Sequence, residues 1–404
     1  MSHETAFVFR GRHALLFATL LIAMWLAPNA HGQQPALTNR ANAVNASTPV
    51  KPPEPMPANG AYARLAQEQG KADSAVLDWV LANSGPVKGD MRAGELRIAF
   101  TVTPAEGWWD KAGSGQLTWH AAPAGNVHLR IFVVDASDGR LVPGLSLRAT
   151  LVDANGNEQS APADFGWYPL LNAYGGNVPI DADSDYALRV AVDPVLPQNR
   201  LSQDERLTHA TIAEFPPVTI SRDAILQLPV ATSTAFNNEA ELLKPCNAAL
   251  SAAITALWQH SASGSEQPAG DYFAGYALDD SALVPPNLET KLHLRIHVSG
   301  KAEVRVVVFP RDSRTGRLIP GLKPQISITA ANGAQFGPGE LPTIWHPWFN
   351  HYGRSVRLPR DGTYKLHVHF DAPGFRRWGR QSERFASALD VDFDNVSLKE
   401  EAKN

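Results

Sequence analysis

Hydrophobic and polar residues alternate along much of the chain in short runs that predict β-strands. Two runs are rich in β-branched residues and a third alternates apolar and polar residues with a period of two: "VHLRIFVVD" (127–135), "EVRVVVF" (303–309) and "KLHLRIHV" (291–298). Gly, Pro, Asn and Asp gather between such runs and predict turns, as in "DSRTGRLIPG" (312–321), "AANGAQFGPG" (330–339) and "RDGT" (360–363). Short strands separated by turns predict antiparallel sheets packed as β-sandwiches.

Two longer stretches, residues 61–84 and 238–261, predict helices. They contain the matching segments "SAVLDWVLAN" (74–83) and "SAAITALWQH" (251–260). Each stretch precedes a set of predicted strands. We expect each helix to pack on one sheet or to bridge the two sets.

These elements form an internal repeat with an offset of 177 to 178 residues. "GRLVPGL" (139–145) recurs as "GRLIPGL" (316–322), and "WYPLLNAYGGNV" (167–178) recurs as "WHPWFNHYGRSV" (345–356). The prediction is therefore a mainly β protein of two tandem antiparallel β-sandwich domains, each preceded by a helix. The first repeat covers residues 61–230, the second covers 231–398, and a tail follows at 399–404.

The first 32 residues have the pattern of a secretory signal peptide. Arg10, Arg12 and His13 form a basic region, "ALLFATLLIAMWLAP" (14–28) is apolar, and "AHG" (30–32) supplies small residues before a cleavage site. An uncleaved membrane anchor is the alternative, although the apolar run is short for a span. Residues 33–60 are rich in Pro and Ala and predict a disordered linker. We expect a periplasmic or secreted protein that is soluble after leader removal.

Composition excludes some classes of function. The formal net charge is −4 and no long basic block occurs, which argues against nucleic acid as a partner. Cys246 is the only cysteine, so an internal disulfide is excluded. The sequence contains no motif of a serine hydrolase, a zinc protease or a P-loop enzyme. An enzyme is not predicted.

Histidines are concentrated in the second repeat, and this asymmetry draws attention to metal binding, because neutral imidazole is a common ligand of Cu(II), Zn and Fe(II). His346 and His351 lie on a loop that Pro347 and several aromatic rings can rigidify. The first repeat has Tyr168 and Ala173 at the matching positions. The alternative is that Trp345, Tyr352 and their neighbours only seal this loop onto the sandwich, since both repeats keep those two residue types.

Other histidines offer weaker candidates. His367 and His369 alternate with apolar residues, so they share one face of a strand about 7 Å apart. The alternative is an ordinary solvated strand face. His293 and His297 are about 13 Å apart along a strand, too far to share one ion. His297 matches His120 of the first repeat, which favours a structural role. Asp371 is a candidate to orient a nearby imidazole.

The order of motifs resembles the bacterial periplasmic iron-transport protein family. The resemblance rests on "DSRTGRLIPGL" (312–322) followed by "HPWFNHYGRSVRLPRDGTYKLHVHFDAP" (346–373), and weaker copies of both in the first repeat. It implies immunoglobulin-like sandwiches that act beside an inner-membrane iron permease. It also implies a copper or iron site with the histidine of "HYG" (here His351), a methionine, a carboxylate and a second histidine as ligands. No methionine follows Met91, so the family's thioether ligand is missing.

Together these patterns predict an exported protein that binds a divalent metal, copper or iron with zinc possible, in its second repeat. The expected ligands are His346 and His351, with His367 or His369 joining them. The first repeat would be a structural partner, so that one chain forms a pseudo-dimer. The competing prediction is a secreted module that binds a protein or a glycan through the rings of Trp345, Trp348, Phe349, Tyr352 and Trp378.

Overall fold

Burial alternates along strands such as Gly362–Phe370, which have one face on the core, whereas strands such as Leu96–Pro104 are buried on both faces. In the computed structural model, Leu366, Val368 and Phe370 are fully buried, while the intervening His367 and His369 face outward. The structure describes residues 60–111, 116–180, 183–200, 206–228, 231–279, 301–346, 349–359 and 362–398. All of them belong to the unit that spans Pro52–Asn404. The predicted signal peptide, nearly all of the linker and the tail lie outside the described residues.

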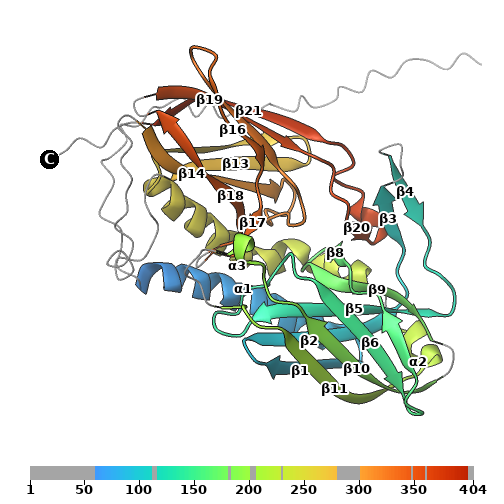
Figure 1. Ribbon diagram of the computed structural model, residues 1–404. Helices are drawn as coiled ribbons and strands as arrows, with labels where there is room; N and C mark the ends of the chain where they lie inside the picture. The colour runs from blue at the N-terminus through green and yellow to red at the C-terminus, as the bar shows by residue number, and fades with distance from the viewer. Residues whose placement is uncertain are drawn as a thin grey trace, which may run out of the picture. The chain divides into compact units, whose positions relative to one another are not determined.

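The first repeat contains two antiparallel sheets (Figure 1). One runs in the order β1 (Lys88–Ala93), β2 (Leu96–Pro104), β5 (Asn126–Asp135), β9 (Ala173–Pro179) and β8 (Phe165–Trp167). The other runs β11 (Thr211–Ile220), β10 (Ser184–Val192), β6 (Leu147–Asp153) and β7 (Glu158–Ala161). The hairpin of β3 (Trp108–Lys111) and β4 (Leu117–His120) extends the first sheet.

The second repeat has the same strand order. Its larger sheet runs β12 (Ser263–Ala269), β13 (Tyr272–Asp279), β14 (Lys301–Asp312), β18 (His351–Pro359) and β17 (Thr343–Ile344). Its smaller sheet runs β16 (Gln335–Glu340), β15 (Gln325–Ala330), β19 (Gly362–Phe370) and β21 (Leu389–Leu398). The predicted mainly β class and the antiparallel sandwiches are confirmed. The turn predicted over "AANGAQFGPG" (330–339) was wrong in its second half. The residues from Gln335 onward form β16, and only the residues before them form the turn between β15 and β16.

The two predicted helices are present as α1 (Gly60–Asn83) and α3 (Ala231–Gln259), and a short α2 (Arg222–Leu226) precedes α3. Gly85 follows α1 with a φ of +93°, a conformation that glycine adopts without strain, and Pro86 comes next. Val76, Leu77 and Val80 of α1 pack on Phe132 of the first repeat. Leu250, Ile254 and Leu257 of α3 pack on Val307 and Phe309 of the second. Each helix therefore covers the outer face of the larger sheet of its own repeat. Among the described residues, no helix has the length and apolar character required to cross a membrane.

The two repeats exchange structural elements. The short strand β20 (Arg376–Trp378) of the second repeat pairs with β8 and β3, and so becomes part of the first repeat's sheet. In the opposite direction, Arg200 forms a β-bridge with Trp345 beside η1 (Pro197–Asn199). Trp345 is buried in the core of the first repeat, and Trp167 is buried in the core of the second. Each core therefore contains a tryptophan supplied by the other repeat.

Candidate metal centre

The structure brings His346 and His351 together. Their ring centroids lie 4.9 Å apart, and the two residues are only 2% and 3% exposed. Phe349 packs beside both imidazoles, with centroid distances of 6.2 Å to His346 and 5.3 Å to His351. The two imidazoles are therefore neighbours in a buried aromatic environment.

Burial keeps both rings neutral. It lowers the pKa of His351 to about 3, and the positive charge of Arg305 contributes to the shift. Burial also lowers the pKa of His346 well below 6.5, with smaller contributions from His351 and Arg305. A neutral imidazole offers a lone pair to a metal at pH 7. The arginine charges oppose a cation, so metal–nitrogen bonds must compensate for that repulsion.

The nitrogens of His351 are available for a ligand. Neither has a hydrogen-bond partner of ordinary geometry. The backbone of Phe349 opposes the lowering of the pKa of His351, and it is the smallest of the three causes of the shift. Buried polar atoms almost always have partners, so an unpartnered buried imidazole indicates a position for water, an ion or a ligand.

The strand and turn around His351 fix its direction. Tyr352 points into the core between the two sheets, so its neighbour His351 faces the opposite side, toward α3. The hydroxyl of Tyr352 donates to the carbonyl oxygen of Ile319 and accepts from the amide of Leu322, both at 2.9 Å. Tyr174 makes the same two bonds in the first repeat. The tyrosine that both repeats keep therefore pins the "PGL" turn.

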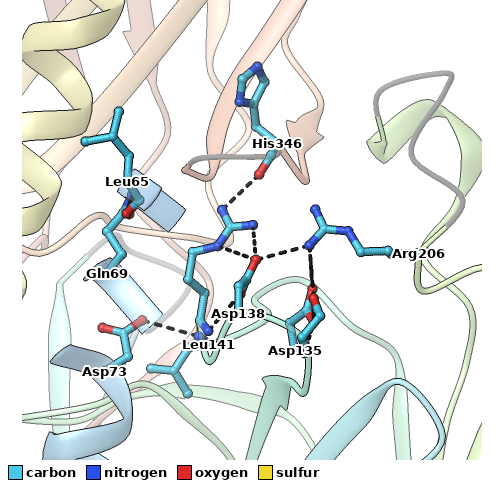
Figure 2. Close-up of polar contacts among 10 residues, drawn as sticks. Leu65, Gln69, Asp73, Asp135, Asp138, Leu141, Arg206 and His346 are labelled. Atoms are coloured by element: carbon cyan, nitrogen blue, oxygen red, sulfur yellow. Dashed lines mark hydrogen bonds and ion pairs between the residues drawn. The ribbon is translucent and has the colours of Figure 1, made fainter. Parts of the chain in front are cut away.

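The backbone of His346 is held by the first repeat. Arg140 donates to the carbonyl oxygen of His346 at 2.8 Å, and its guanidinium lies 4.5 Å from the ring of Trp345. Asp138 accepts from Arg140 at 2.8 Å and from Arg206 at 3.1 Å (Figure 2). This buried network positions the loop that carries the candidate ligand.

His367 and His369 do not join this pair. They lie on β19 of the smaller sheet and point away from the core, whereas His351 lies on the outer face of the larger sheet. The Nδ1 atom of His367 is 2.8 Å from Asp392, and that of His369 is 2.8 Å from Asp390. Asp371 is 3.5 Å from His369 and mostly exposed. The expectation that one of these histidines would complete a site with His346 and His351 is not met.

Three or more His, Cys, Asp or Glu side chains do not converge anywhere in the described residues in a way that could hold a metal. His297 and Trp348 lie outside the described residues. The two buried imidazoles fit a metal as a partial ligand set, because they are neutral, adjacent and able to donate lone pairs. Further ligands would have to come from water or from groups other than these two imidazoles.

The aromatic rings near the pair are not a stacking surface. Trp345, Phe349, Tyr352 and Trp378 are each 3% exposed or less. A sugar ring stacks on an exposed aromatic face, and these faces are covered by protein. The four described rings of the predicted glycan or protein platform therefore serve packing.

A buried polar cluster that the sequence analysis did not predict lies at the corresponding face of the first repeat. Arg130 and Glu106 form an ion pair at 2.8 Å with side chains 5% and 1% exposed. The ring of His128 lies 3.0 Å from the hydroxyl of Tyr168, and burial lowers the pKa of His128 to about 4. Tyr168 stands where the second repeat has His346. At the position of His346, the first repeat therefore has a tyrosine that is hydrogen-bonded to His128. The alternating strand pattern could not predict this hydrogen bond or the ion pair of Arg130 with Glu106.

Comparison with known proteins concerns the second repeat. Residues 260–395 match the family model described as Fe2+ transport protein. The second repeat is related to that family. His346 and His351 both lie inside the matched segment, and so do β12 to β20. The resemblance predicted from "GRLIPGL" and "HYG" is confirmed for this part of the chain.

Solved structures give more distant similarities. A copper-bound variant of FetP from uropathogenic Escherichia coli is 14% identical, covering 35% of this chain and 94% of that chain, with a TM-score of 0.26. A DUF4426 family protein from Pseudomonas aeruginosa is 14% identical, covering 34% and 97%, with a TM-score of 0.24. The curated protein sequences give no match.

Proposed function

We propose that this chain is an exported metal-binding protein of the iron-uptake type, which binds copper or iron through His346 and His351 in its second repeat. The observation that carries the proposal is the buried contact between these two imidazoles, 4.9 Å apart, inside the segment related to Fe2+ transport proteins. Zinc is a further candidate, because imidazole is also one of its common ligands.

The pair has the properties that a metal ligand requires. Both rings remain neutral because burial disfavours the imidazolium, so protons compete poorly with a metal at neutral pH. Arg140 holds the backbone at His346, and the hydroxyl of Tyr352 anchors the strand that carries His351. Side chains held in this way lose little conformational entropy when an ion binds.

The first repeat acts as the structural partner in this proposal. Its position equivalent to His351 is Ala173, and Tyr168 replaces His346, so it lacks the imidazole pair. Its Arg140 donates a hydrogen bond to the backbone of His346. In the other direction, β20 joins the sheet of the first repeat and Trp345 packs in its core. We propose that the chain is a pseudo-dimer of the two repeats. The leader at 1–32 would deliver it to the periplasm, where an inner-membrane iron permease is the expected partner.

The test is a metal titration of the mature protein, its His346→Gln/His351→Gln double variant and a matched His367→Gln/His369→Gln double variant. One equivalent of Cu(II) or Fe(II) should bind the parent and the control variant, and be lost in the first variant. Glutamine keeps polarity and hydrogen bonding, and circular dichroism checks the fold. Absence of binding in the parent, or equal binding by all three proteins, would refute the proposal.

A further inference from the structure

A pocket with a volume of about 140 Å³ lies between the two repeats, and its walls are mostly apolar. Each repeat supplies the same motif to it, because residues 141–143 of "GRLVPGL" match residues 318–320 of "GRLIPGL". Phe165 and Phe309 add one aromatic ring from each repeat. A cavity of about 150 Å³ with apolar walls holds one benzene molecule. This pocket therefore has room for one six-membered ring.

Three asparagine side chains interrupt the apolar lining, and each has an acceptor that lacks a donor. The Oδ1 atoms of Asn172, Asn247 and Asn350 are buried and accept no hydrogen bond from any described residue. Asn247 donates its Nδ2 to the carbonyl oxygen of Thr315 at 2.6 Å, so its oxygen is the atom left over. Buried polar atoms almost always have partners, so three such oxygens around one space indicate an occupant that donates hydrogen bonds.

The internal repeat explains why these oxygens share one space. Asn172 and Asn350 are 178 residues apart and occupy the same position in the two repeats. Each lies two residues before the tyrosine that pins a "PGL" turn, Tyr174 or Tyr352, and both tyrosines also line the pocket. One acceptor therefore comes from each repeat, and α3 adds a third. A ligand with a single donor would leave two of them unsatisfied, so a ligand with several donors fits better.

The charged groups of the lining favour a neutral occupant. The guanidinium of Arg140 pairs with Asp138 at 2.8 Å, and that of Arg317 donates to the carbonyl oxygen of Tyr168 at 2.7 Å. The carboxyl group of Asp73 also lines the pocket. Burial raises the pKa of Asp73 to about 6, so this group is mostly ionised at pH 7.5 and repels an anion. Because both signs of charge line the pocket, neither an anion nor a cation gains from the whole set.

We propose that this pocket binds a neutral organic molecule with an apolar body the size of one six-membered ring and two or more hydroxyl groups, of which resorcinol is a simple example. The ring packs on Phe165, Phe309 and the paired turn segments, and the hydroxyl groups donate to the asparagine oxygens. A sugar of the same size fits less well, because most of its hydroxyl groups would face apolar walls and lose their hydrogen bonds to water. The proposal goes beyond metal binding and does not depend on it, since none of these groups is a candidate metal ligand.

The test is a calorimetric titration of the mature full-length chain at pH 7.5 with resorcinol, benzene and benzoate. EDTA is present, because His351 also lines the pocket and a metal ion there would add a second ligand. Resorcinol should bind about tenfold more tightly than benzene or better, since each hydrogen bond gained contributes roughly fivefold. It should also bind more tightly than benzoate. Undetectable binding of resorcinol, equal affinity for resorcinol and benzene, or tighter binding of benzoate would each overturn the proposal.

Two variants locate the binding site. Asn172→Ala/Asn350→Ala removes one acceptor from each repeat, so resorcinol should lose about fivefold or more in affinity while benzene keeps its own. Leu318→Trp fills the pocket from a half-buried position and should abolish binding of both. The matched controls Asn155→Ala and Leu226→Trp change the same residue types at exposed positions and should bind like the parent. Circular dichroism checks the fold, and the alanine variant decides alone if Leu318→Trp does not fold. Resorcinol binding that is unchanged in the folded pocket variants would place the ligand elsewhere and refute the proposal.

Discussion

The guanidinium of Arg140 donates to the carbonyl oxygen of His346 at 2.8 Å, across the boundary between the repeats. Arg317, which matches Arg140 in the second repeat, donates to the carbonyl oxygen of Tyr168 at 2.7 Å, and Tyr168 matches His346. The arginine of each "GRL" motif therefore donates a hydrogen bond to the backbone of the "W-x-P" loop of the other repeat, and we call this reciprocal contact the clasp. The two motifs that recur in the sequence are the two halves of one reciprocal contact.

Loss of this clasp should destabilise the protein. Arg140→Ala removes a cation that is almost fully buried and paired with Asp138, so that carboxylate loses this charge partner and keeps its ion pair with Arg206. Breaking a buried pair of this kind should lower the free energy of unfolding by about 3 kcal/mol. Urea denaturation followed by tryptophan fluorescence measures the change.

The matched control is Arg148→Ala. Arg148 also pairs with an aspartate, Asp193, but its side chain is 68% exposed. An exposed pair contributes about 1 kcal/mol or less. Equal losses for the two variants would mean that the clasp contributes no more than an ordinary surface pair.

Much of the fold could be predicted from local patterns. Period-two alternation gives β19 and its buried Leu366, Val368 and Phe370, because a strand places alternate side chains on opposite faces. The repeated motifs predicted two sandwiches of one design, and the matching strand orders came from the structure. The same alternation placed His367 and His369 correctly on one face, but it cannot say which sheet a strand joins or what lies opposite.

The rest depends on contacts between segments distant in the sequence. Trp345 enters the core of the first repeat, and β20 enters its sheet, because the repeats pack reciprocally. The pairing of Glu106 with Arg130 likewise follows from tertiary packing. The convergence of Asn172 and Asn350 on one pocket also requires that packing, although both copies of the repeated motif keep this asparagine.

The exchanged tryptophans predict effects in the opposite repeat. Trp345→Ala leaves a cavity in the core of the first repeat, so it should lower the free energy of unfolding by about 3–5 kcal/mol. Hydrogen exchange followed by mass spectrometry should show the greatest loss of protection in β5 and β10, which belong to the first repeat. Trp167→Ala should do the reverse, exposing β14 and β19.

Trp109→Ala serves as the control, because Trp109 is only half-buried on the β3–β4 hairpin. Its loss should leave protection in both cores unchanged. Faster exchange confined to the second repeat in Trp345→Ala would contradict the exchange of tryptophans between the cores.

Stability should fall as the solution becomes mildly acidic. Burial lowers the pKa of His128 to about 4 and that of His351 to about 3. Below pH 6.5 the unfolded chain binds protons that these folded rings exclude, so each ring costs about 1.4 kcal/mol per pH unit. Asp73 acts in the opposite direction, because burial raises its pKa to about 6. The folded state therefore takes up a proton there as the pH falls, which offsets part of the loss.

Urea denaturation at pH 7.5, 6.0 and 5.0 measures this dependence. His128→Phe should flatten the curve between pH 6.5 and 5.0, because it removes one of the excluded protons. A slope that is the same in the parent and in His128→Phe would show that this ring is protonated in the folded state.

Metal affinity should depend only weakly on pH if His346 and His351 are the ligands. An exposed histidine pair with pKa values near 6.5 is largely protonated at pH 5.5, so binding a metal there requires the release of two protons and loses affinity by roughly a hundredfold between pH 7.5 and 5.5. The buried pair is already neutral over this range, because burial lowers both pKa values far below it. Cu(II) titrations of the parent at the two pH values should therefore give dissociation constants within a few-fold of one another. A hundredfold loss at pH 5.5 would assign binding to exposed histidines such as His367 and His369, and their double glutamine variant would then abolish it.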